Sequence, residues 1–88
     1  METVALSGDL TLATAVQRSE EMAPRLQGPE LTLDLAAIGE VDSTAVSLLL
    51  HWKRDARAAG RLLIFRNPPA SLRSLAALYG VEDVLGLG

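Results

Sequence analysis

The fold is decided by residues 31–66, which read LTLDLAAIGEVDSTAVSLLLHWKRDARAAGRLLIFR. Leucines at every second position of residues 31–35 predict a strand, because the side chains of a strand alternate between its two faces. Apolar residues at helical spacing predict a helix from about residue 44 to residue 59, with Gly60 as its stop. Four consecutive apolar residues within 61–66 predict a second strand that is covered on both faces, as in a parallel sheet.

The same alternation of strands and helices continues on both sides of this stretch. Residues 3–7 predict a short strand, and a helix with Thr11 as its N-cap is expected to follow. Ser71 is expected to cap a third helix, and residues 81–85 to form a last helical turn. The order β-α-β-α-β-α predicts one α/β domain over residues 1–88, with a mixed, partly parallel sheet and helices packed against it.

Composition excludes several classes of chemistry. The 88 residues include no cysteine, which excludes a disulfide scaffold, a thiol nucleophile and any cysteine-based metal site. One histidine cannot form a multi-histidine metal site, and three aromatic residues are too few for the stacking platforms of single-strand nucleic-acid binders. A net charge of -3 argues against a nucleic-acid partner. We expect no metal and no cofactor.

The distribution of hydrophobic residues argues against direct insertion into a membrane. No run approaches the roughly 18 consecutive apolar residues that span a bilayer. The first residues also lack the basic and apolar regions of a signal peptide. A cytoplasmic protein is therefore expected.

The sequence contains no recognisable catalytic constellation. Ser43 and His51 are separated by two helical turns, roughly 12 Å, which is too far for a hydrogen bond between a nucleophile and its base. The acidic pairs at 20–21 and 82–83 are sequence neighbours that point in different directions, so a two-carboxylate hydrolase is not indicated. We expect a protein that is not an enzyme and has no catalytic residue.

The N-terminal end of the second predicted helix is the main candidate site. The segment Asp42-Ser43-Thr44 brings two hydroxyl groups to the first turn, where free N–H groups can stabilise an anion such as a phosphoryl group on Ser43 or Thr44. The same three residues are also good N-caps, and capping alone accounts for their presence. Both interpretations stand on the sequence.

One side of this helix is a candidate docking surface. Its other side is assigned to the core, through Ala45, Leu48, Leu49, Trp52, Ala56 and Ala59. Val46 and Leu50 fall opposite that stripe and are expected to be exposed among cations. The candidate partner-binding residues are Val46, Ser47, Leu50, His51, Lys53, Arg54 and Arg57. Isolated surface apolar residues are common, so an ordinary solvated face explains them equally well.

Charge is distributed unevenly between the two parts of the chain. Residues 1–50 carry eight acidic and two basic side chains, whereas residues 51–88 carry three acidic and six basic ones. The basic part either presents a positive patch to an acidic partner or consists of ordinary solvated helix faces, and charge patterning alone favours the second interpretation.

The pattern resembles the STAS domain over nearly the whole chain. The resemblance rests on Leu6-Ser7-Gly8-Asp9-Leu10, on Leu33-Asp34-Leu35, and on Val41-Asp42-Ser43 before an apolar helix. Within the family, Leu48-Leu49-Leu50-His51 and residues 75–81 are most similar to the small cytoplasmic STAS subunit of Mla-type phospholipid-transport ABC systems.

The resemblance implies a STAS-like α/β fold and a non-catalytic regulatory subunit of a bacterial lipid-transport complex. Such a subunit would dock on the ABC transporter ATPase through the Asp42-Ser43 end of the second helix. It would be cytoplasmic, or peripheral at the inner membrane through the complex. The family also includes anti-sigma factor antagonists, which implies the alternative that an anti-sigma factor serine kinase phosphorylates Ser43.

Two positions carry the family's site, and two depart from it. Ser43 falls where antagonists have their phosphorylated serine and where the transporter subunit has a functionally important threonine, and Asp42 matches the preceding acidic residue. The family usually has one or two glycines next, whereas Thr44 and Ala45 stand here. This bulkier and less flexible loop counts against a phosphorylation switch.

Overall fold

Three parallel strands form the main sheet. In the computed structural model, which describes residues 2–87, the strands follow the order β1-β3-β5. Their bounds are β1 Glu2–Ala5, β3 Glu30–Asp34 and β5 Leu62–Arg66. Every pairing among the described strands is parallel, so the expected α/β fold with parallel strands is confirmed and the sheet is not mixed.

A second, two-stranded sheet continues from the first, and sequence reasoning missed it. It consists of β2 (Gly8–Leu10) and β4 (Ile38–Val41), which pair in parallel. The chain was expected to form one strand over residues 3–7 and a connector before Asp42. Instead, β1 ends at Ala5, and a further strand follows within a few residues. Strands of three or four residues are too short to show an alternating pattern, which explains the error.

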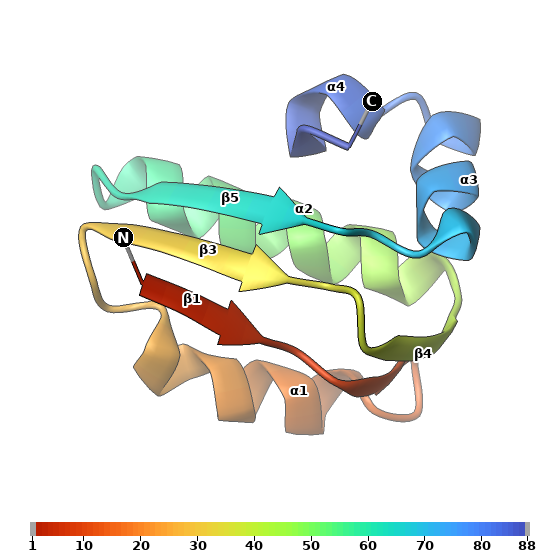
Figure 1. The fold of residues 1–88 in the computed structure, drawn as a ribbon, viewed down its shortest axis with the longest axis horizontal. Coiled ribbons are helices and arrows are strands. Elements are labelled where there is room, and N and C mark those ends of the chain that lie inside the picture. Colours follow the sequence, from red (N-terminus) through yellow and green to blue (C-terminus); the bar gives the residue numbers. More distant parts are fainter. Residues whose placement is uncertain (1, 88) are drawn as a thin grey trace.

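Helices cover one face of the main sheet. Their bounds are α1 Ala15–Met22, with the 3-10 turn η1 at Ala23–Arg25, α2 Ser43–Ala58, α3 Ala70–Leu78 and α4 Glu82–Leu85. Successive strands are added in one direction, from β1 to β3 to β5, and right-handed crossovers then place α1 and α2 on the same side. Figure 1 shows α2 behind the sheet and no helix in front of it.

Two of the expected helix caps are wrong. The residue before α1 is Thr14 rather than Thr11, and the residue before α3 is Pro69 rather than Ser71. Thr11 belongs to a turn ahead of the helix, in which its N–H donates to Thr14 Oγ1 at 3.0 Å. Extended backbone at Pro69 directs the chain into α3, and no side chain caps that helix.

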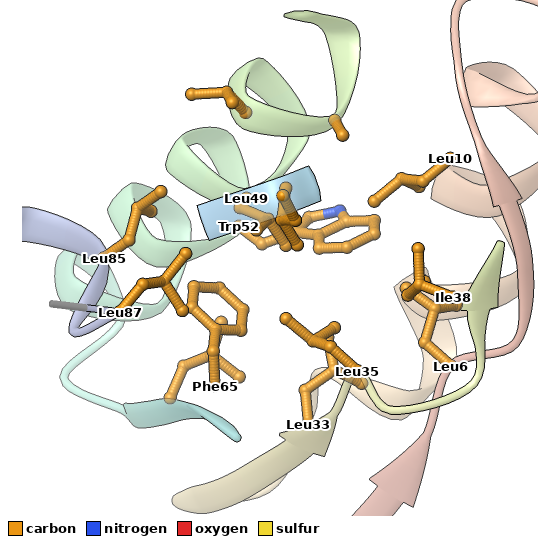
Figure 2. Packing of buried hydrophobic residues seen from close by; sticks show 14 of the residues in the cluster. Leu6, Leu10, Leu33, Leu35, Ile38, Leu49, Trp52, Phe65, Leu85 and Leu87 are labelled. Carbon is orange, nitrogen blue, oxygen red and sulfur yellow. The ribbon is translucent and has the colours of Figure 1, made fainter. Parts of the chain in front are cut away.

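The core lies between the sheet and α2. Figure 2 shows Leu49 and Trp52 of α2 pointing toward residues of the sheet and of the segment that follows β3. The labelled core residues are Leu6, Leu10, Leu33, Leu35, Ile38, Leu49, Trp52, Phe65, Leu85 and Leu87, all buried. This packing holds α2 against the sheet and so sets the position of its N-terminal end.

The expectation that β5 is covered on both faces is wrong. Leu63 and Phe65 are buried, whereas Leu62 is 48% exposed and Ile64 is half-buried. The helices pack on one face only, so the side chains that alternate toward the other face keep contact with solvent.

Candidate functional site

Asp9 holds β4 in place just before the start of α2. Its Oδ1 atom accepts a hydrogen bond from the Glu40 N–H at 2.9 Å. A Cβ atom on Gly39 would lie 2.5 Å from that oxygen, so this contact requires glycine at position 39. The Asp9 carbonyl accepts two further hydrogen bonds, from Thr14 Oγ1 at 2.9 Å and from Arg18 Nε at 3.1 Å. Asp9 therefore ties α1, β2 and β4 together.

Asp42 caps α2 and also binds a distant loop. Its Oδ1 accepts a hydrogen bond from the Thr44 N–H at 2.8 Å, and its Oδ2 accepts one from the Leu12 N–H at 3.0 Å. The bond from Leu12 is the largest of the influences that lower the pKa of Asp42. Desolvation, the second-largest influence, raises this pKa, and smaller contributions from Thr44 and Ala45 lower it. The capping interpretation is thus confirmed for Asp42.

Ser43 is the exposed hydroxyl of this segment. It is the first residue of α2, and its hydroxyl makes no hydrogen bond to any residue that the structure describes. The Thr44 side chain, by contrast, is half-buried and helps to lower the pKa of Asp42. Of the two hydroxyl-bearing residues that the sequence pointed out, Ser43 is the one that is exposed to another molecule.

A hollow lies beside Ser43, between α2 and the end of α3. We call it the Ser43 hollow, and its lining residues are Ser43, Val46, Ser47, Leu50 and Tyr79. Its volume is about 380 Å³. Tyr79 follows the last residue of α3 and is 53% exposed.

Sequence reasoning did not predict that Tyr79 lies at this hollow. The signal was the pair Leu78-Tyr79 directly before Gly80. Two adjacent large residues at a helix end cannot both face the core, because neighbours on a helix point about 100° apart. Both are exposed, Leu78 by 75%.

The expected exposure of Val46 is wrong. Val46 is only 4% exposed and belongs to the core, although it forms the floor of the Ser43 hollow. The helix α3 packs against α2 on this side, so α2 is covered by a helix as well as by the sheet. Leu50 is half-buried at the border of this contact, and Leu48, which was assigned to the core, is also only half-buried.

The other candidate partner-binding residues lie along the exposed side of α2. Ser43, Ser47, Leu50, Arg54 and Arg57 follow one another at intervals of three or four residues, and we call this row the α2 strip. All of them except the half-buried Leu50 are exposed. The structure therefore brings most of the residues predicted from the sequence onto one surface.

His51 and Lys53 flank the α2 strip and have partners within the chain. His51 Nε2 lies 3.2 Å from Asp55 Oδ2, an exposed pair that contributes little to stability. Lys53 is half-buried, donates to the carbonyl of Leu63, and its Nζ lies 5.4 Å from the centre of the Phe65 ring. Partial burial lowers the pKa of Lys53.

The geometry suits recognition of another molecule. It combines a free hydroxyl, an apolar hollow with an aromatic rim, and a row of cations, which are features of binding surfaces. Within residues 2–87, no group of three or more His, Asp or Glu side chains could hold a metal ion. In the same part of the chain, no helix combines the length and the apolar character that crossing a membrane requires.

Comparison with known proteins points to one family. The family model described as "Mlab, STAS domain" matches residues 2–87, and no curated protein matches the chain. The structure of the anti-sigma factor antagonist SpoIIAA in its unphosphorylated form has a TM-score of 0.72 at 19% identity, covering 92% of this chain and 73% of that one.

Two solved transporter proteins are also similar. A sulfate transporter family protein from Wolinella succinogenes has a TM-score of 0.71 at 14% identity, over 99% of this chain and 70% of that one. The SulP transporter STAS domain from Vibrio cholerae has a TM-score of 0.67 at 18% identity, over 97% of this chain and 67% of that one. At such identities these structures show a shared fold.

Proposed function

The chain belongs to the STAS domain family described as Mlab, and from this premise we propose that it is a non-catalytic subunit of a bacterial phospholipid-transport ABC complex. STAS domains are generally regulatory or binding modules that mediate protein–protein interactions. In this role the protein docks on the ATPase subunit through the Asp42-Ser43 end of α2. It is cytoplasmic and is held at the inner membrane by the complex, without inserting into lipid.

The observation that carries the proposal is the free Ser43 hydroxyl at the rim of the Ser43 hollow. Asp42 and Asp9 fix the backbone around it through hydrogen bonds of 2.8–3.0 Å, so the surface is organised before a partner arrives. Preorganisation of this kind reduces the entropy lost on binding. The ATPase subunit would insert an apolar side chain into the hollow against Tyr79, a residue type that often dominates binding energy.

The alternative is an anti-sigma factor antagonist that a serine kinase phosphorylates on Ser43. It is supported by the likeness to SpoIIAA and by the exposure of Ser43. Against it, Thr44 and Ala45 stand at the start of α2 where the family usually has glycines, which makes this segment bulkier and less flexible. The transporter subunit is therefore the function that we favour.

The deciding experiment is purification of the protein from its native host with its bound partners. Recovery of an ATPase and a membrane permease is expected, and recovery of a soluble serine kinase alone would overturn the proposal. Ser43→Asp is expected to weaken binding to the purified ATPase subunit at least tenfold, because it places a second carboxylate beside Asp42 at the contact.

The matched control is Ser74→Asp, which makes the same change at an exposed serine of α3 that does not line the Ser43 hollow. It is expected to leave the affinity for the ATPase subunit unchanged. Equal affinity of the Ser43→Asp protein and the wild type would place the interface elsewhere. The melting temperatures of both variants report whether the fold is intact.

A further inference from the structure

We propose that a groove between the C-terminal half of α2 and β5 is a second binding surface, which takes an extended acidic segment of a partner protein. We call it the basic groove, and its lining residues are Lys53, Ala56, Arg57, Arg61, Leu62, Leu63 and Val84. The inference extends the proposed function and rests on it, because it takes the binding partner to be a protein.

The basic groove is long enough for several residues of a partner. Its volume is about 410 Å³, and a neighbouring hollow that shares Lys53, Arg57 and Val84 continues it toward Leu50 and Arg54. Lys53 and Arg57 lie about one helical turn apart, roughly 6 Å at the helical rise, and Arg61 follows the end of α2 at Ala58.

The positive charges in the basic groove are held in place but not neutralised. No residue that lines the groove or its continuation is acidic, among the residues that the structure describes. Lys53 donates to the carbonyl of Leu63, and the Arg61 guanidinium donates to the carbonyl of Leu26. Carbonyl groups orient the two cations without cancelling their charge. An incoming carboxylate therefore does not have to displace a carboxylate of the protein itself.

Three nearby carboxylates stay outside the lining of the groove. Asp55, on the same helix, pairs with His51 and lines an adjoining hollow together with Arg61. Glu82 and Asp83 of α4 adjoin Val84 in sequence but are also absent from the lining. The partial burial that lowers the pKa of Lys53 is consistent with a cation that lacks a carboxylate partner.

Apolar side chains favour a peptide over a small anion. Val84 of α4 is 61% exposed, and it lines the groove together with the half-buried Ala56 of α2. β5 is an edge strand of the described sheet, so its outer side can also bond to an extended backbone. Inorganic phosphate would use only the cations, and a flat membrane surface cannot enter a groove. An extended segment that alternates acidic and apolar residues would use all of these features.

The test is fluorescence anisotropy of the whole protein with a fluorescein-labelled octapeptide of alternating Glu and Leu, at an ionic strength of about 0.05 M to limit screening. Saturable binding is expected for this peptide and not for the matching peptide of alternating Lys and Leu. Arg57→Glu is expected to weaken binding about tenfold, because it replaces an attraction with a repulsion.

The matched control is Arg73→Glu, which makes the same charge change at an exposed residue of α3 outside the groove. It is expected to change the affinity less than about twofold, because Arg73 does not line the groove and an exposed charge outside a contact contributes little. Equal binding of the two peptides, or equal losses in the two variants, would overturn the proposal. So would Arg57-dependent flotation with phosphatidylglycerol vesicles in the absence of peptide binding, which would identify a membrane as the ligand.

The two proposals fail in different ways. If the ATPase subunit binds in a Ser43-dependent manner and the acidic peptide does not bind, the basic groove alone is refuted. If the peptide binds with the expected dependence on Arg57 and no ATPase is recovered, the transporter role alone is refuted.

Discussion

Replacement of Gly39 by alanine tests whether the contact between Asp9 and β4 supports the functional end of α2. The new Cβ atom would lie 2.5 Å from Asp9 Oδ1, so the carboxylate must rotate away and release the Glu40 N–H. The nearest atom outside the Asp9 side chain, the carbonyl carbon of Gly8, is at 3.7 Å, which is an ordinary contact. The loss of one hydrogen bond is therefore the main cost of the substitution.

The expected size of the effect follows from two opposing contributions. A hydrogen bond to a charged acceptor contributes about 1.5 kcal/mol at the lower end of its range, which suits this exposed bond. Replacing glycine by alanine restricts the unfolded chain, which stabilises the folded state by about 0.4–1 kcal/mol. Gly39→Ala should therefore destabilise the fold by about 0.5–1 kcal/mol, which lowers the melting temperature of a domain of this size by about 2–8 °C.

The assay is thermal and urea unfolding followed by circular dichroism, with Gly28→Ala as the matched control. A Cβ on Gly28 meets only the Glu30 carbonyl oxygen at 3.7 Å, so Gly28→Ala should raise stability by about 0.4–1 kcal/mol. In an Asp9→Ala background the same small gain is expected for Gly39→Ala, which gives a coupling of about 1.5 kcal/mol between the two positions. An equal effect of Gly39→Ala with and without Asp9 would refute the reasoning.

Two further predictions concern the packing of the core and the stability of the protein at acidic pH. Val46→Ala should lower the free energy of unfolding by about 1.5–3 kcal/mol because Val46 is buried, whereas Ser47→Ala beside it should change it by less than about 0.5 kcal/mol. Urea unfolding measures both values, and equal losses would contradict the burial of Val46. The pKa of Asp42 is lowered in the folded state, so the unfolded state binds the proton more readily. The contribution of Asp42 to the free energy of unfolding is therefore complete above the unfolded pKa of 3.8 and is lost as the pH falls below that value. The urea midpoint of the wild type should then fall more steeply below pH 3.8 than that of Asp42→Asn, and parallel curves would remove Asp42 as the cause.

Much of the fold could be predicted because its signals are local. The strand at β3 and the helix α2 were predicted within a residue or two of their bounds, since each has a long periodic pattern and a clear start or stop. The strands β2 and β4 were missed, because their pairing depends on a parallel neighbour about 30 residues away and leaves little trace in three or four residues.

The candidate site was predicted in part for the same reason. The side of α2 that carries Ser43, Arg54 and Arg57 follows from helical spacing alone, and the structure shows these residues exposed. The burial of Val46 could not be derived, because it depends on where α3 lies. The place of Tyr79 could not be derived either, because Tyr79 reaches the Ser43 hollow only through the packing of α3 against α2.

By itself, the amino-acid sequence determined the type and order of the long elements, the Asp42-Ser43 start of α2 and the absence of cysteine chemistry. These properties depend on neighbours within a few residues, or on composition, and need no tertiary contact. The tertiary structure alone decided which side of α2 remains open, how Asp9 supports β4, and that Lys53, Arg57 and Arg61 line one groove with Leu62 and Val84. Exposure and the meeting of distant side chains depend on how whole elements pack, and that information is distributed over the entire chain.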